Sequence, residues 1–184
     1  MDASIAAILG AAIGAVGGLG GGLLTVRAQL RTVAAQHRAD EKRWLADVRR
    51  GTYTDFVTCT KQLSNAIWKA SDSLHGDEAP EAWEDSFRSV HDAWTQFSAA
   101  SAAVTMAGPH AVSAAAEELR RSMRNWEMLT GSWIRASVGQ GIGQLEHYDE
   151  RFMAAFEAKR PLEEAFQLAA RRALGTEGDA VTTG

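Results

Sequence analysis

Cysteine is scarce in this sequence, and strand patterns are missing from it. The only cysteine among the 184 residues is Cys59, which excludes an intramolecular disulfide framework and a zinc site built on several cysteines. A single cysteine is also typical of a reducing compartment. No stretch alternates apolar and polar residues with the β-branched character of a strand. These absences predict an all-α fold that no disulfide stabilises.

Charge is missing from the first part of the chain, where Asp2 is the only charged side chain before Arg27. Residues 3–26 form a run of 24 uncharged residues. As a helix this run would be about 36 Å long, which exceeds the roughly 30 Å of a bilayer's hydrocarbon core. No positive segment precedes the run, and this disfavours a cleaved signal peptide. The sequence therefore predicts a transmembrane helix over residues 1–26.

Basic residues follow the uncharged run, with seven basic against three acidic side chains over residues 27–50. The positive-inside rule then predicts a single-pass protein of a bacterial inner membrane, with the N-terminus outside and the rest in the cytoplasm. The charge either only sets this topology or also contacts anionic lipid headgroups, at about 1 kcal/mol per residue. The residues nearest the membrane are Arg27, Arg31, Arg38, Lys42 and Arg43.

Glycine is concentrated in the uncharged run, which holds seven of the 17 glycines in the chain. Their spacing of four residues predicts a flat helix face where another backbone can approach, hence self-association or packing on a partner membrane protein. The alternative is that small residues are simply common in transmembrane helices. The glycines on the predicted packing face are Gly10, Gly14, Gly17, Gly18, Gly21 and Gly22.

The chain after the run divides into a charged juxtamembrane helical stalk over residues 27–43, a cytoplasmic bundle over 44–175 and a disordered tail over 176–184. Within the predicted bundle, apolar residues step by three and four in four helical stretches, a heptad-like spacing. Breaks are predicted between Gly76 and Pro80, at Gly108-Pro109, over residues 139–143 and at Gly175, with Gly108 ending the second helix and Pro109 as the first residue of the third. Matched lengths and short connections favour an antiparallel four-helix bundle.

Two details of this bundle are specific enough to test. Pro161 lies inside the fourth stretch, where a proline removes a backbone donor. We therefore expect a kink there, or a new helix that begins at Pro161. The apolar stripe predicted for the first stretch consists of Leu45, Val48, Thr52, Phe56, Cys59, Leu63, Ala66, Ala70 and Leu74. The stripe of the second stretch consists of Trp83, Phe87, Val90, Trp94, Phe97, Ser101 and Val104, and that of the third consists of Val112, Ala116, Leu119, Met123, Trp126, Leu129 or Thr130, and Trp133. The stripe of the fourth stretch consists of Tyr148, Phe152, Ala155, Lys159, Leu162, Phe166, Ala169 and Ala173.

Patterns that carry chemistry are weak throughout the sequence. The five histidines form no H-x-x-x-H pair, and none follows a glutamate by three residues, as zinc and di-iron helices require. His147 with Asp149 and Glu150 is the densest polar cluster, and an exposed helix start is its commoner meaning. We expect no catalytic, cofactor or metal site and no enzyme activity. Nucleic acid is disfavoured as a partner, because residues 51–184 carry 12 basic and 19 acidic side chains.

Tryptophan is the most unusual component of the predicted bundle. Trp44 and Trp68 stand beside the apolar stripes instead of on them, so they are candidate interface residues. The alternative is a position at the edge of the core.

The uncharged Gly/Ala run, the stalk and the segment from Arg43 to Arg50, with Tyr53 and Phe56 after it, resemble uncharacterised single-pass proteins of high-GC actinobacteria. That resemblance implies a membrane-anchored helical bundle and no particular activity. A more distant likeness is to fungal HeLo-like cell-death domains, whose glycine-rich N-terminal segment attacks membranes. Two functions therefore stand as hypotheses: a membrane-anchored interaction and oligomerisation module, or a holin-like or defence effector whose glycine-rich segment inserts as an oligomer.

Overall fold

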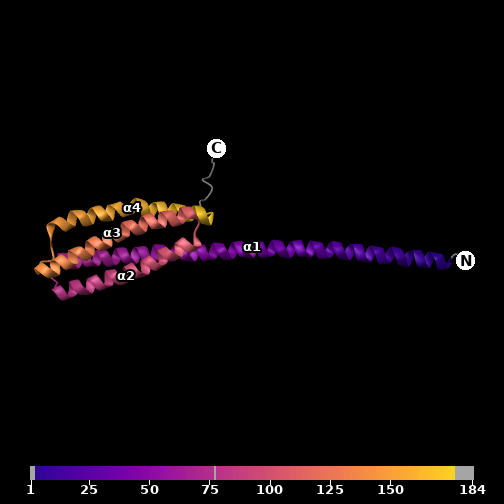
Figure 1. Cartoon of the computed structure of the whole chain (residues 1–184), viewed down its shortest axis with the longest axis horizontal. Coiled ribbons are helices and arrows are strands. Elements are labelled where there is room, and N and C mark those ends of the chain that lie inside the picture. Colours follow the sequence, from indigo (N-terminus) through magenta and orange to yellow (C-terminus); the bar gives the residue numbers. More distant parts are fainter. Residues whose placement is uncertain (1–2, 77, 177–184) are drawn as a thin grey trace, which may run out of the picture. The chain divides into compact units, whose positions relative to one another are not determined.

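Helices account for almost all of the chain in the computed structural model. The structure describes the backbone of residues 3–76 and 78–176, and the side chains of residues 36–76, 78–145 and 147–176. No strand occurs in these ranges, so the prediction of an all-α fold with four bundle helices is confirmed at this level (Figure 1). The four helices are α1 (Ala3–His75), α2 (Pro80–Ala107), α3 (His110–Gln140) and α4 (Glu146–Leu174).

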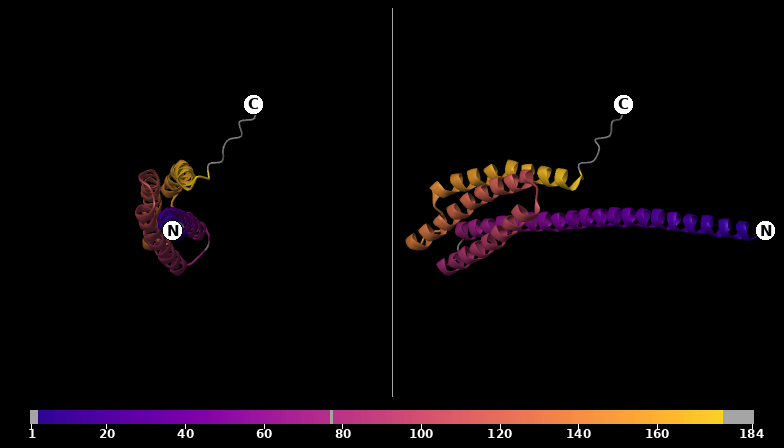
Figure 2. Two further views of the ribbon diagram at one scale, coloured as in Figure 1. Left: turned by 90° about the vertical axis from the view of Figure 1, so that its right-hand side faces the viewer. Right: turned by 45° about the vertical axis from the view of Figure 1, so that its right-hand side comes forward.

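The chain separates into two compact units, Met1–Leu45 and Ala46–Gly184. In the second unit the part of α1 from Ala46 to His75 packs with α2, α3 and α4. Consecutive helices of this unit run in opposite directions in Figure 1 and in the right-hand view of Figure 2, and they are joined by short connections. In the first unit, the described side chains of residues 36–45 are mostly exposed.

The predicted breaks coincide with the ends of the helices. Gly141 and Gly175 adopt φ angles of 67° and 66° at the C-caps of α3 and α4, a left-handed conformation that glycine adopts without steric cost. Pro80 is the first residue of α2. The break at Gly108-Pro109 is confirmed in place but differs in detail, since Gly108 is extended and Pro109 is the N-cap of α3 instead of its first residue.

Of the two outcomes expected at Pro161, a new helix is wrong, because α4 continues through this residue to Leu174, and a kink there stays a prediction. A proline here leaves the carbonyl of Glu157 without its helical donor. Both residues are exposed, so water can bond to that carbonyl. Continuity keeps Phe152 and Phe166 on one buried face of α4, and a break between them would misalign the two rings.

Aromatic side chains join the helices at successive levels of the bundle. The Phe56 ring of α1 stacks on Phe97 of α2 at a centroid distance of 5.2 Å and meets Phe166 of α4 at 4.5 Å. Further along α1, the Trp68 ring packs edge-on against Trp126 of α3 at 6.1 Å. The bundle part of α1 therefore contacts all three other helices.

The predicted stripe of α1 is correct in part. Phe56, Leu63, Ala70 and Leu74 are buried, whereas Leu45 and Val48 are exposed and Cys59 and Ala66 are only partly buried. Buried polar side chains complete the face instead, because the hydroxyl groups of Thr60 and Ser64 donate hydrogen bonds to carbonyls one turn earlier, at 2.7 and 2.8 Å. A hydroxyl satisfied in this way can enter a core. The stripes predicted for α2 and α3 are buried along most of their length.

Several predictions fall outside the residues that the structure describes in full. The side chains of residues 1–35, including the glycine-rich run, are not among the described ones, nor are residues 177–184 of the predicted tail. Among the described residues, no helix combines the length and the apolar character that crossing a bilayer requires.

Gly143 and Gly51 provide a matched pair of predictions for the bundle. A Cβ atom on Gly143 would collide with the carbonyl oxygen of Leu74 and lie 2.9 Å from the Trp83 ring, whereas one on Gly51 meets nothing within 4 Å. We expect Gly143→Ala to destabilise the bundle by about 1–3 kcal/mol. Gly51→Ala should stabilise it by about 0.5–1 kcal/mol. Urea unfolding followed by circular dichroism checks both, and equal effects of the same sign would contradict the packing at Gly143.

Candidate functional site

A groove of about 420 Å³ lies between α1 and α4 near the end of the bundle that begins at Ala46. Its rim carries three cationic side chains, those of Arg50, Lys61 and Arg171, and none of its lining residues is acidic. The floor is apolar and includes Phe166. A cationic rim over an apolar floor suits an anionic ligand with some apolar surface.

Two of the three cations make no ion pair within the described part of the chain. Lys61 and Arg171 have no carboxylate within ion-pair distance there, while Arg50 pairs with Asp47 at 3.2 Å on the surface. Both members of that pair are largely exposed, so their attraction is weak and screened by salt. The rim therefore keeps most of its positive charge.

A buried lysine lies between the same two helices, outside the lining of the groove. Lys159 on α4 is only 7% exposed, and its ammonium group donates hydrogen bonds to Ser64 Oγ at 3.1 Å and to Glu163 at 3.2 Å. It also lies 5.7 Å from the ring centroids of Trp126 and Phe156. An ion pair, a hydroxyl and two aromatic faces together compensate for the loss of water around the charge.

The Ser64–Lys159 contact has the composition of a nucleophile and a base, but its hydrogen bonds run the other way. A lysine base must accept the serine proton. Here the ammonium donates to Ser64 Oγ, and the Ser64 hydroxyl donates to the Thr60 carbonyl. The contact therefore acts as a structural hydrogen bond that holds the lysine head.

The far end of the bundle brings together residues of α1, α3 and α4. His75 Nε2 lies 3.0 Å from Asp149 Oδ1, and its Nδ1 lies 2.7 Å from the Ser71 carbonyl. The His75 ring meets the Trp133 ring edge-on. In the cluster noted from the sequence, Asp149 thus pairs with a histidine of another helix, while His147 is exposed beside Tyr148. Within the described residues no group of three metal-ligating side chains forms.

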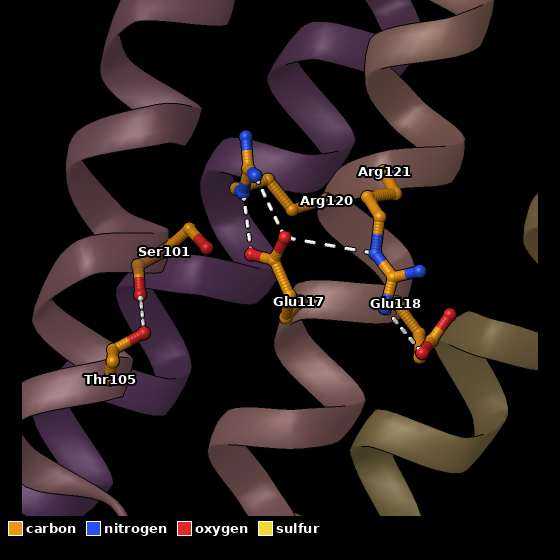
Figure 3. A network of polar contacts seen from close by, with 6 residues as sticks. All are labelled: Ser101, Thr105, Glu117, Glu118, Arg120 and Arg121. Carbon is orange, nitrogen blue, oxygen red and sulfur yellow. Dashed lines mark hydrogen bonds and ion pairs between the residues drawn. The ribbon is translucent and has the colours of Figure 1, made fainter.

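A network of ion pairs covers the start of α3 (Figure 3). Both terminal oxygens of Glu117 accept hydrogen bonds from the Arg120 guanidinium, at 2.7 and 2.8 Å, and Arg121 lies 3.7 Å away. These hydrogen bonds lower the pKa of the Glu117 carboxyl and raise the pKa of Arg120, each against an opposing effect of burial. All of these ion pairs join residues three or four positions apart on α3, a spacing that stabilises a helix.

The described candidates from the sequence lie mostly on the surface. Arg38, Lys42 and Arg43 are exposed, and the Trp44 side chain is 63% exposed. Trp68 is partly buried, with its ring edge-on to Trp126, Phe152 and Phe156, which places it at the edge of the core. The remaining candidates, Arg27, Arg31 and the glycines at 10, 14, 17, 18, 21 and 22, lie outside the described side chains.

Sequence reasoning missed both the groove and the hydrogen bond between Lys159 and Ser64 inside the core. Lys159 was visible as a polar member of the apolar stripe on α4, but its partner Ser64 is 95 positions away. The groove cations come from two helices and show no shared pattern along the chain. Only the antiparallel pairing of α1 with α4 brings these residues together.

Comparisons with protein-family models, with curated proteins and with solved structures found no match to this chain. The fold therefore defines the class at the level of an all-α helical bundle.

Lys159 and Glu163 provide a second prediction, about which member of the buried ion pair costs more unfolding free energy when it is replaced. Glu163→Gln should cost about 1–3 kcal/mol of unfolding free energy, because it leaves a buried ammonium without its counter-charge. Lys159→Met fills similar volume without a charge, and the Glu163 carboxylate that it leaves unpaired is 22% exposed, so this variant should stay within about 1 kcal/mol of the parent. Chemical denaturation of both variants decides the order, and a larger cost for Lys159→Met would contradict this description of the pair.

Cys59 provides a prediction about reactivity. Burial, and to a smaller extent the Asp55 carboxylate, raise the pKa of the Cys59 thiol. A raised pKa leaves less thiolate at neutral pH, and the thiolate is the reactive form. The rate at which Cys59 reacts with a disulfide reagent is measured over a range of pH. The pH of half-maximal rate should be higher for the folded chain than for the unfolded chain. Asp55→Asn should lower that pH, whereas Asp72→Asn on the same helix should not; equal profiles for all variants would contradict the Asp55 contribution.

Proposed function

We propose that this protein is a membrane-anchored helical bundle that acts as an interaction and oligomerisation module. In this proposal residues 1–26 span the inner membrane once, and the bundle lies in the cytoplasm. One observation carries it: the 24-residue uncharged run belongs to α1, the helix that also supplies one side of the bundle core. Helices that pack through the glycine face would therefore bring their bundles together on the same side of the membrane.

The surface of the described residues supports an interaction role. The Trp44 ring is 63% exposed in the first unit, and Met106 is 83% exposed in the second. Large exposed apolar side chains such as these are common where proteins meet partners. The resemblance to single-pass actinobacterial proteins is consistent with the same architecture and adds no activity to it.

A second function has its own supporting observation, which is the weak hydrophobicity of the run. Seven glycines among 24 residues leave nine strongly apolar side chains, worth about −3 to −5 kcal/mol on an insertion scale. Insertion of so weakly apolar a segment is more favourable when several copies pack together as an oligomer than when one helix enters the membrane alone. A holin-like or defence effector would use this property to perturb the membrane.

Membrane attachment and glycine packing are tested together. The full chain should resist extraction by carbonate and yield to detergent, and a variant lacking residues 1–26 should be released without detergent. In detergent, Gly14→Ile with Gly18→Ile should lower the oligomeric state measured by light scattering, because the larger side chains hold the backbones apart. Gly139→Ile is the control, since that glycine lies in α3.

The outcomes separate the two functions. Release of the full chain by carbonate would contradict both. An unchanged oligomer after the glycine substitutions would contradict packing through the glycine face. Depolarisation of cells on expression, lost on removal of residues 1–26, would favour the effector function over the module.

A further inference from the structure

The groove between α1 and α4 differs in charge from the unit around it. Residues 51–184 carry 19 acidic against 12 basic side chains, yet the groove lining holds three cations and no carboxylate. Among the described residues, Lys61 and Arg171 have no ion-pair partner. A local excess of unpaired positive charge on an acidic protein favours an anionic ligand there.

The cations stand at the two ends of the groove. Arg50 lies six residues before Phe56 on α1, and Arg171 lies five residues after Phe166 on antiparallel α4. Because the rings of Phe56 and Phe166 are in contact, Arg50 and Arg171 share one end. Lys61 lies eleven residues after Arg50, which corresponds to about 16 Å along the helix axis.

The polar groups between these ends repeat at the spacing of an extended peptide. Thr54 and Thr58 follow Arg50 along the α1 rim at intervals of four residues, about 6 Å each. Side chains on one face of an extended peptide repeat about every 7 Å.

Hydrogen-bonding groups in the middle of the groove favour a peptide over an acyl chain. The Thr54 hydroxyl donates to the Arg50 carbonyl at 2.8 Å, which leaves its oxygen able to accept a backbone N–H. Gln167 on the opposite rim offers both a donor and an acceptor. An acyl chain would cover these groups without pairing them, at a cost in free energy. The floor of Val57, Phe166 and Ala170 suits small apolar side chains.

We propose that this groove binds an extended acidic peptide segment of a partner protein. Carboxylates near one end of the segment pair with Arg50 and Arg171, a carboxylate near the other end pairs with Lys61, and small apolar side chains between them contact the floor. The inference rests on the proposed interaction function for the existence of a partner. It does not depend on the membrane segment, because all of its residues lie in the second compact unit.

The test measures binding of a labelled peptide to the full chain in detergent by fluorescence anisotropy. The probe is an eight-residue peptide with two glutamates at each end and alternating Val and Ser between them. Binding should weaken as salt rises. Lys61→Gln with Arg171→Gln should weaken it at least about tenfold, while Lys69→Gln with Arg160→Gln, the same charge change on the same helices outside the groove, should leave it unchanged.

A charge-reversal variant separates the loss of contacts from misfolding, because only a folded variant can gain binding to a probe of opposite charge. Lys61→Glu with Arg171→Glu should lose the acidic probe and bind a version with lysine in place of glutamate. Recovery of binding by the reversed pair would confirm the position of the contacts. Equal binding of both probes by the parent chain, or equal losses in the groove variants and the control variants, would overturn the proposal.

Two alternative occupants of the groove, a lipid and the chain's own C-terminal residues, would each give a distinct experimental result. Groove-dependent binding to vesicles that contain phosphatidylserine, with no binding of the peptide, would assign the groove to lipid and overturn the proposal. A gain in peptide affinity when residues 177–184 are removed would overturn the partner assignment in favour of the chain's own acidic residues, Glu177 and Asp179. If peptide binding fails while carbonate resistance and oligomerisation persist, the groove proposal falls and the proposed function remains.

Discussion

The bundle depends on the burial of one face of α1 between Ala46 and His75. That face reaches Phe97 of α2, Trp126 of α3 and Phe166 of α4 through ring contacts, so it is the shared apolar surface on which the other three helices meet. Aromatic rings bury a large area and prefer edge-on or offset contacts, which fixes the levels at which antiparallel helices align. The groove between α1 and α4 follows from this alignment.

Polar groups enter the core only where a local or paired partner satisfies them. Thr60 and Ser64 bond to carbonyls of their own helix, and Lys159 then uses Ser64 and Glu163 at the interface of α1 and α4. An ion pair in this position contributes little net stability, since desolvation offsets much of the attraction. The lysine does favour one register of α4 on α1, because any slip would take its ammonium away from Ser64.

Charge is distributed unevenly along and around the molecule. The uncharged run is followed by a basic segment and then by an acidic bundle, and the proposed topology rests on this order. Within the acidic bundle, the groove between α1 and α4 gathers cations from two helices. In these two proposals, membrane attachment and peptide recognition use different parts of one protein.

The sequence by itself determined the helical class, the breaks at glycine and proline, and the buried faces of α2 and α3, because helix periodicity and turn chemistry are local properties. Tertiary structure decided what local rules leave open. The core face of α1 includes Thr60 and Ser64 since their hydroxyls are satisfied within the helix, and α4 passes through Pro161 because its buried rings require one continuous face. The Ser64–Lys159 hydrogen bond and the cationic groove exist only because folding brings together residues that lie far apart in the chain.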